Sequence, residues 1–141
     1  MSRIFWDTML FIYLLEDHPE FAGRTRQILD RSYHRGDSLF TSYLVLGELM
    51  AGAERFSSPQ TASEITRIIR EMGFSLLSFD EGAVTPFGVL RSKQKVKIPD
   101  AIHLACASSA GIDLYLTGDS GLFRLDVPGI QFIANFNSSV L

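Results

Sequence analysis

Four acidic residues stand where their carboxylates could do chemistry: Asp7, Glu48, Asp100 and Asp119. Asp7 and Asp119 come just after short apolar runs of the kind that form buried strands. Asp100 follows Pro99 in the first turn of a predicted helix, where the helix dipole favours a negative charge. Glu48 has apolar neighbours in another predicted helix, where an unpaired carboxylate would be costly. Each position has an ordinary structural explanation alone, but together they suggest a common site.

Carboxylates that share one cleft repel each other unless a cation lies between them. Their oxygens suit Mg²⁺, or alternatively Mn²⁺, and we expect Asp7 and Asp100 as the principal ligands. Glu48 and Asp119 would complete the metal's shell directly or through water. Such an ion lowers the pKa of a bound water and stabilises the charge that develops when a phosphate ester is hydrolysed. The sequence shows no Cys/His spacing for zinc and no arrangement of Ser, Cys and His for nucleophilic catalysis.

The acids need a sheet and helices to bring them together. Apolar runs predict strands at residues 4–6, 39–41, 74–79, 114–116 and 130–133. Apolar periodicity predicts helices at residues 9–15, 20–34, 43–54, 62–72, 81–95 and 99–110. This alternation implies a parallel sheet covered on both faces, and ligands bind at the carboxyl ends of such strands. The helices at 43–54 and 62–72 have no strand between them and should form a helical arm beside the sheet.

Composition sets the broad class of the protein. The chain has 141 residues, which we interpret as one domain over residues 1–141, and 46% of them are hydrophobic. The net charge is −3, so a binding site for a polyanion would have to be local. The single cysteine, Cys106, excludes an internal disulfide and suits a reducing cytosol. No signal peptide or membrane span is visible, and we expect a cytoplasmic protein.

The four acids lie in segments that resemble the acidic motifs of PIN domains. These segments are Phe5-Trp6-Asp7-Thr8, Leu46-Gly47-Glu48-Leu49, Pro99-Asp100-Ala101-Ile102-His103-Leu104-Ala105 and Leu116-Thr117-Gly118-Asp119. Their order and spacing, and the length of the chain, are most similar to the small VapC toxins of prokaryotic toxin–antitoxin pairs. The resemblance implies a three-layer α/β/α sandwich with a five-stranded parallel sheet. It also implies a Mg²⁺-dependent endoribonuclease, usually a homodimer, that a partner antitoxin inhibits.

The resemblance also implies roles for particular residues. The four acids correspond to the metal-binding catalytic acids of the family. Thr117 matches a polar position often found beside the fourth acid, whereas Gly118 departs from the Asn or Asp common there. We expect Thr8 to orient an acid or a water, and Ser42 to do so or to act only as a helix N-cap. His103 lies one turn after Asp100, where hydrogen bonding or packing explains it better than catalysis.

A basic run leads to Asp100 and consists of Arg91, Lys93, Lys95 and Lys97. Such a run is usually a solvated face. Because this one adjoins the predicted cleft, binding of RNA phosphates explains it equally well. An inhibitor of the cleft should itself offer Arg or Lys to the carboxylates, and its apolar segment could lie between the helices at 43–54 and 62–72.

Three other functions are compatible with parts of the pattern. The chain could be an RNA-processing PIN nuclease without a toxin role. It could be a catalytically silent PIN-like module for partner binding, although the presence of all four acids argues against that. Asp7 and the Gly118-Asp119-Ser120 segment also suggest a phosphate-ester hydrolase of the haloacid-dehalogenase type. That chemistry needs acids where this chain has Met9 and Phe123, so we rank it last.

Overall fold

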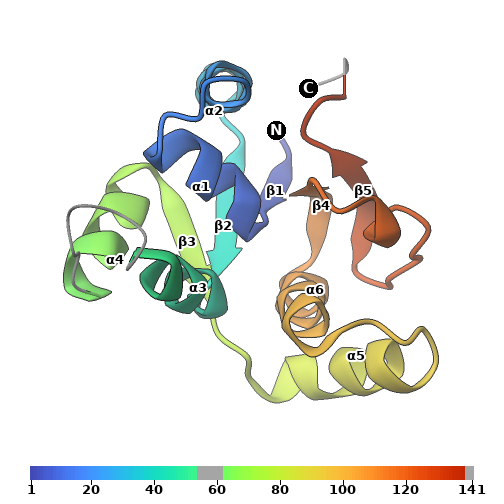
Figure 1. Cartoon of the computed structure of the whole chain (residues 1–141). Helices are drawn as coiled ribbons and strands as arrows, with labels where there is room; N and C mark the ends of the chain where they lie inside the picture. The colour runs from blue at the N-terminus through green and yellow to red at the C-terminus, as the bar shows by residue number, and fades with distance from the viewer. Residues whose placement is uncertain (54–61, 139–141) are drawn as a thin grey trace.

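The chain alternates short strands with helices, as the sequence predicts, in a computed structural model that describes residues 1–53 and 62–138 (Figure 1). In chain order, the elements are β1 (Arg3–Trp6), α1 (Thr8–Leu15), α2 (Ala22–Arg35), β2 (Ser38–Ser42), α3 (Tyr43–Ala53), α4 (Ala62–Glu71), β3 (Phe74–Leu77), α5 (Glu81–Ser92), α6 (Ile98–Ala110), β4 (Ile112–Thr117), the 3₁₀ turn η1 (Ser120–Leu122) and β5 (Ile130–Asn135). None of the described helices has the length and apolar composition needed to cross a membrane.

The five strands form one parallel sheet in the order β3-β2-β1-β4-β5. In the central strand β1, Phe5 pairs with Phe40 of β2 on one side and with Tyr115 of β4 on the other. The chain builds outward from β1 through β2 to β3, and then returns to place β4 and β5 on the opposite side. The strand order therefore reverses between β1 and β4, and ligands of open α/β sheets bind at the carboxyl ends of such strands.

Helices cover both faces of the sheet, which confirms the predicted three-layer α/β/α sandwich. Side chains alternate along β1, so Ile4 and Trp6 face one core while Phe5 faces the other. The first core packs α1, α2, α3 and α4 against the sheet, and the second packs α5 and α6 against it. Helices α3 and α4 pack against each other at one side of the sheet as the predicted helical arm (Figure 1).

Helix α6 is more deeply buried than its sequence pattern suggests. It has Pro99 in its first turn and ends at Gly111, whose φ of 73° is in the left-handed region that suits glycine. The helical spacing of Ile102, Ala105, Cys106 and Ser109 predicts that they share one buried face. This prediction is wrong for Ser109, which is exposed, and Ile102 is only partly buried. The helix packs against both α5 and α3 as well as the sheet, and its buried residues are Ala101, His103, Leu104, Ala105, Cys106 and Ala107.

Some predicted boundaries and buried positions differ from the structure. The strand predicted at 74–79 ends at Leu77, and Phe79 is exposed. The helix predicted to reach residue 95 ends at Ser92. The helical spacing of Tyr43, Leu46 and Met50 predicts that they share a buried face. The side chain of Tyr43 instead stays at the surface, where its hydroxyl accepts a hydrogen bond from Arg70. The predicted end of that helix at residue 54 lies outside the described residues.

Candidate active site

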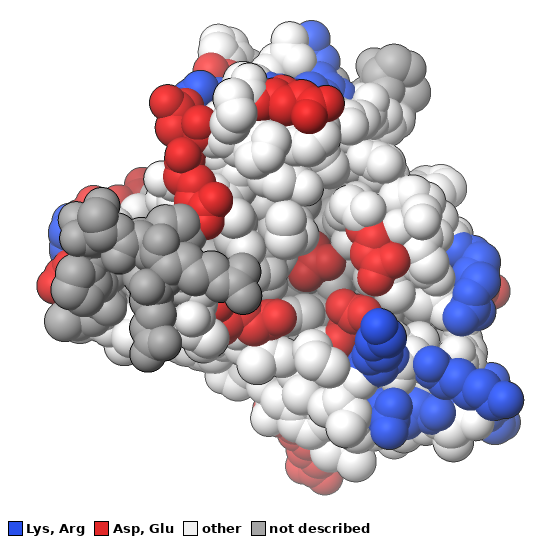
Figure 2. Space-filling model, viewed as in Figure 1, with Lys and Arg blue, Asp and Glu red and all other residues white. Residues whose placement is uncertain are grey.

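All four predicted acids line one cleft of about 420 Å³ at the carboxyl end of the sheet. Figure 2 shows acidic side chains gathered around a hollow near the centre of this face. The cleft is lined by Asp7, Thr8, Met9, Ile12, Glu48, Ala51, Gly52, Asp100, Thr117 and Asp119. Four separate parts of the fold therefore supply the carboxylates: the end of β1, the middle of α3, the start of α6 and the residues after β4.

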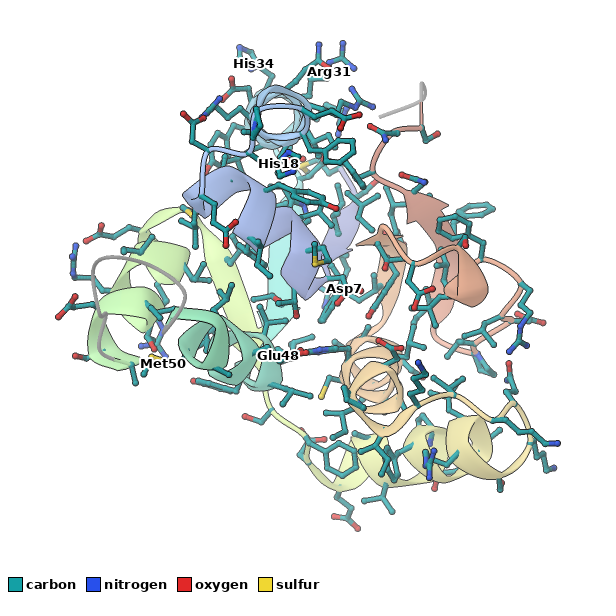
Figure 3. All side chains as sticks on the ribbon, in the orientation of Figure 1. Asp7, His18, Arg31, His34, Glu48 and Met50 are labelled. Atoms are coloured by element: carbon teal, nitrogen blue, oxygen red, sulfur yellow. The ribbon has the colours of Figure 1, made fainter. Side chains whose placement is uncertain are left out.

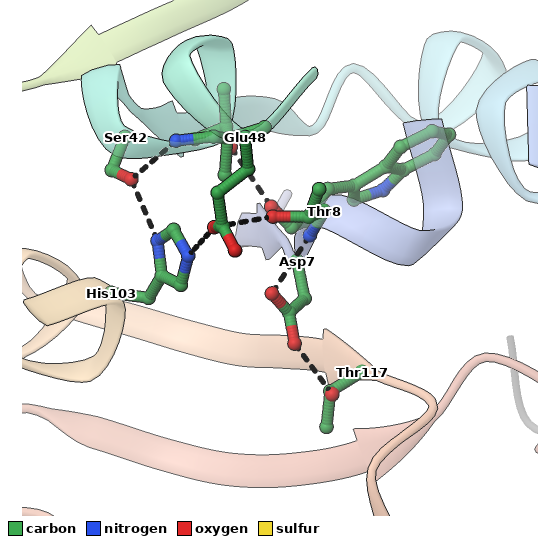
Figure 4. A network of polar contacts seen from close by, with 9 residues as sticks. Asp7, Thr8, Ser42, Glu48, His103 and Thr117 are labelled. Atoms are coloured by element: carbon green, nitrogen blue, oxygen red, sulfur yellow. Dashed lines mark hydrogen bonds and ion pairs between the residues drawn. The ribbon is translucent and has the colours of Figure 1, made fainter. Parts of the chain in front are cut away.

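Asp7 joins the two strands at the point where the strand order reverses. Its backbone N–H donates to the carbonyl of Leu116 in β4 at 3.0 Å. Its side chain is buried and caps α1, because Oδ1 accepts from the N–H of Thr8 at 2.7 Å. Its other oxygen, Oδ2, accepts from the hydroxyl of Thr117 at 2.7 Å (Figure 4). Both carboxylate oxygens of Asp7 are thus held by the protein.

Thr117 links the first acid to the fourth. Its hydroxyl oxygen donates to Asp7 and accepts from the backbone N–H of Asp119 at 3.1 Å. The carboxylate of Asp119 in turn caps η1, accepting from the N–H of Gly121 at 2.9 Å. Gly118, which lies between the two, offers no side chain to this network. Thr117 therefore supplies the polar support beside Asp119 that Gly118 does not.

Glu48 enters the cleft from the helical arm with two hydrogen-bond donors on one oxygen. Thr8 donates its hydroxyl to Glu48 Oε1 at 2.9 Å, and Nε2 of the buried His103 contacts the same oxygen at 2.5 Å. The other ring nitrogen of His103 lies 2.8 Å from the hydroxyl of Ser42 (Figure 4). Partial burial acts to raise the pKa of Glu48, but the hydrogen bond and charge of His103 and the bond from Thr8 outweigh it, so that pKa is lowered.

The pKa of Asp100 is shifted in the opposite direction to that of Glu48, although both line the same cleft. Burial raises the pKa of Asp100, and the carboxylates of Asp7, Asp119 and Glu48 raise it further, with His103 opposing them. The acids are therefore close enough to repel one another, which is the electrostatic condition for binding a cation.

The donor chemistry of the cleft fits a hard divalent cation. Its polar lining consists of four carboxylates and two threonine hydroxyls, the oxygen ligands that Mg²⁺ and Mn²⁺ prefer. Across residues 1–53 and 62–138, no group of three or more His, Cys, Asp or Glu side chains is already arranged to hold a metal ion. Figure 3 shows Asp7 and Glu48 facing the same space, while His18 and His34 lie by α2, away from it.

The predicted basic run lies beside the cleft and does not line it. Lys93, Lys95 and Lys97 are exposed between α5 and α6, whereas Arg91 donates to the carbonyl of Val96 at 3.0 Å. Figure 2 shows Lys and Arg side chains gathered at the lower right, next to the acidic hollow. Three lysines of the run are therefore free to meet a polyanion, while Arg91 also holds the loop.

Sequence reasoning missed two contributions to this face. It gave His103 no specific partner, although the helical spacing from Asp100 placed both on one face. It also missed Arg124, whose side chain lies 3.5 Å from the carbonyl of Gln94 and so adds a positive charge near the basic run. No local pattern indicates that contact, because 30 residues separate the two positions.

The chain matches the model of a known family. Residues 4–128 match the model of the PIN domain, and the chain belongs to the PIN domain family. A search of curated proteins found no significant match.

Solved structures with this fold include chains of toxin–antitoxin complexes. A chain of VapBC2 from Rickettsia felis, bound to a promoter DNA fragment, is 18% identical, with 94% of this chain and 97% of that one covered and a TM-score of 0.72. A chain of DNA-bound VapBC from Salmonella typhimurium is 22% identical, with 96% and 99% covered and a TM-score of 0.69. A chain of a toxin–antitoxin complex from Klebsiella pneumoniae is 22% identical, with 92% and 95% covered and a TM-score of 0.64. At these identities the likeness shows the shared fold.

Proposed function

We propose that this protein is a metal-dependent endoribonuclease that hydrolyses phosphodiester bonds of RNA. The observation that carries the proposal is that Asp7, Glu48, Asp100 and Asp119, from four parts of a PIN domain, line one cleft. In the part of the chain that the structure describes, the lining includes no Ser, Cys or His that could serve as a covalent nucleophile or its base.

The four acids would contribute differently to binding the metal ion. Asp7 and Asp100 would be the principal ligands of Mg²⁺ or Mn²⁺, and Glu48 and Asp119 would complete the shell directly or through water. When bound, such an ion supplies an acidic water and positive charge beside the phosphate. A bound cation would lower the pKa of Asp100, because its charge opposes the repulsion that raises that pKa.

The threonines would position the carboxylates, and the lysines would attract the RNA. Thr117 and Thr8 fix Asp7 and Glu48 by hydrogen bonds, which keeps these carboxylates in place before the substrate arrives. Lys93, Lys95 and Lys97 would attract RNA phosphates to a protein whose net charge is −3.

A purified-protein assay tests this activity and its substrate class. The protein is incubated with RNA, single-stranded DNA and an aryl phosphate monoester, each with Mg²⁺, with Mn²⁺ or with EDTA. We expect cleavage of RNA with either metal and none with EDTA. Asp7→Asn should abolish it, while the matched change at an exposed acid on α2, Asp30→Asn, should not. RNA cleavage in EDTA, or turnover of the monoester alone, would contradict the proposal.

We further propose that the protein is the toxin of a toxin–antitoxin pair, acting in the cytosol as a homodimer. Support comes from the toxin–antitoxin complexes whose chains share its fold. The inhibitor would place an Arg or Lys among the four carboxylates, since a cation there relieves their repulsion. An RNA-processing nuclease without a toxin role remains the second candidate, because the same cleft would serve it.

A further inference from the structure

The two oxygens of the Glu48 carboxylate have different surroundings. Oε1 receives both donors, the hydroxyl of Thr8 at 2.9 Å and Nε2 of His103 at 2.5 Å. None of the residues described in the structure hydrogen-bonds Oε2. Figure 4 shows this second oxygen pointing away from His103, on the side of Asp7. One oxygen is therefore committed to the protein and the other is available to the cleft.

His103 is itself fixed from behind. Its ring is 1% exposed, so its orientation is set by packing and by its two polar contacts. Because an ionised carboxylate can only accept, Nε2 carries the proton that faces Glu48. Ser42 lies 2.8 Å from Nδ1, and its oxygen also accepts from the N–H of Val45 at 3.4 Å. The Ser42 hydroxyl can donate to Nδ1 of a neutral imidazole or accept from Nδ1 of an imidazolium, so it anchors the ring in either state.

We propose that His103 is a positioning residue that, anchored by Ser42, holds Glu48 so that Oε2 is presented to the cleft as a metal ligand. This inference rests on the proposed metal-dependent function. An unrestrained glutamate samples many rotamers and loses that freedom on binding. A bond from α6 to a side chain of α3 removes that freedom in advance, and partners of this kind are worth about 10- to 100-fold in metal affinity.

Two substitutions at His103 separate its two contacts. The side-chain nitrogen of glutamine reaches about as far as Nε2 of histidine, so His103→Gln can still donate to Glu48. The side-chain amide of asparagine reaches only as far as Nδ1, so His103→Asn can contact Ser42 but not Glu48. The pair has similar polarity and differs in the contact that the proposal requires.

The test measures Mn²⁺ binding by the full-length, metal-free protein, from the electron paramagnetic resonance signal of free Mn²⁺. It compares the wild type, His103→Gln, His103→Asn and Glu48→Gln, and the double variant that combines His103→Asn with Glu48→Gln. We expect His103→Asn to weaken binding by about 10- to 100-fold and His103→Gln to weaken it less, because glutamine keeps the donor to Glu48 but loses the anchor at Ser42. In the Glu48→Gln background, His103→Asn should cause no further loss, because its effect acts through that carboxylate.

The outcomes separate this inference from the proposed function. A wild type that binds no Mn²⁺ would refute the proposed function, and the positioning role with it. Wild-type affinity in His103→Asn, or an equal loss with and without Glu48, would refute the positioning role alone. If thermal melts show that His103→Asn does not fold, Ser42→Ala replaces it. That variant removes the anchor of His103, and it should weaken Mn²⁺ binding only when Glu48 is present.

Discussion

Two carboxylates of one cleft, Glu48 and Asp100, show opposite pKa shifts. Both are partly buried, which raises the pKa of a carboxyl group. The pKa of Glu48 is nevertheless lowered, because His103 and Thr8 donate hydrogen bonds to its carboxylate. The side chain of Asp100 accepts no hydrogen bond from the described residues, and three acids lie near it. The charge of Asp100 therefore costs the metal-free protein stability.

Replacing Asp100 by asparagine should therefore stabilise the metal-free protein. Because the pKa of Asp100 is higher in the folded than in the unfolded chain, its ionisation costs stability as the pH rises above the ordinary value of 3.8. We expect Asp100→Asn to raise the Tm by about 2 °C at neutral pH. The gain should shrink as the pH falls towards 4, since the wild-type carboxyl then becomes neutral.

Thermal melts in EDTA at several pH values measure this effect, and Asp30→Asn on the exposed face of α2 is the control. A Tm for Asp100→Asn below that of the wild type at neutral pH would contradict the account of repulsion.

For individual residues, the sequence predicts where the acids meet better than it predicts which side chains hydrogen-bond to them. The ends of apolar runs and the start of a helix indicated where Asp7, Asp119 and Asp100 would meet, because strand ends of a parallel sheet share one edge. The contact between His103 and Glu48 could not be predicted in the same way. It joins residues 55 positions apart and depends on how α3 packs against α6.

The elements were predicted by type more reliably than by length. Strand β4 was expected at residues 114–116 and spans Ile112–Thr117, and β5 was expected at 130–133 and spans Ile130–Asn135. The extra residues of β4 pair with β5, since Ile112 lies opposite Ile130 and Thr117 opposite Asn135. Pairing register sets these ends, and register is a property of two strands that neither apolar run contains alone.

The turn before β5 depends on a glycine. Gly129 has a φ of 92°, and a Cβ there would lie 2.3 Å from the carbonyl oxygen of Ser108 in α6. Gly129→Ala should therefore destabilise the fold by about 1–3 kcal/mol from backbone strain, with the clash adding to it. Gly88→Ala in α5 is the matched control, since a Cβ there would meet nothing within 4 Å beyond the adjacent residues and backbone of its own helix. A helical site of this kind should gain about 0.5–1 kcal/mol.

Urea unfolding midpoints of the two glycine variants provide the comparison. Equal midpoints would mean that the contact between α6 and the β5 turn does not constrain the fold.

At the scale of the whole molecule, a cluster of positive charge lies beside the acidic cleft on the face shown in Figure 2. Lys93, Lys95 and Lys97 are exposed there, and neutralising all three should weaken RNA binding. If each lysine contacts one phosphate of a single strand, the slope of log affinity against log salt concentration should become less negative by about 2 in the triple variant. Binding is measured in the Asp7→Asn background so that the RNA stays intact. Arg67→Gln on α4 serves as the control, and an unchanged slope in the triple variant would show that the run is only a solvated face.

The toxin role concerns the molecule in its cell. Expression of the wild type alone should arrest growth, because RNA is cut, and co-expression of the protein encoded beside it should restore growth. Asp7→Asn should be harmless at the same protein level. Harmless expression of the folded wild type would contradict the toxin role and favour RNA processing.

The most direct test of the central claim maps new 5′ ends in total cellular RNA after treatment with the purified protein. The wild type is compared in Mg²⁺ and in EDTA, and Asp7→Asn is compared in Mg²⁺. We predict a defined set of new ends with the wild type in Mg²⁺ and none in the other two reactions. The same ends in EDTA, or with Asp7→Asn, would contradict hydrolysis by a metal ion held in the acidic cleft.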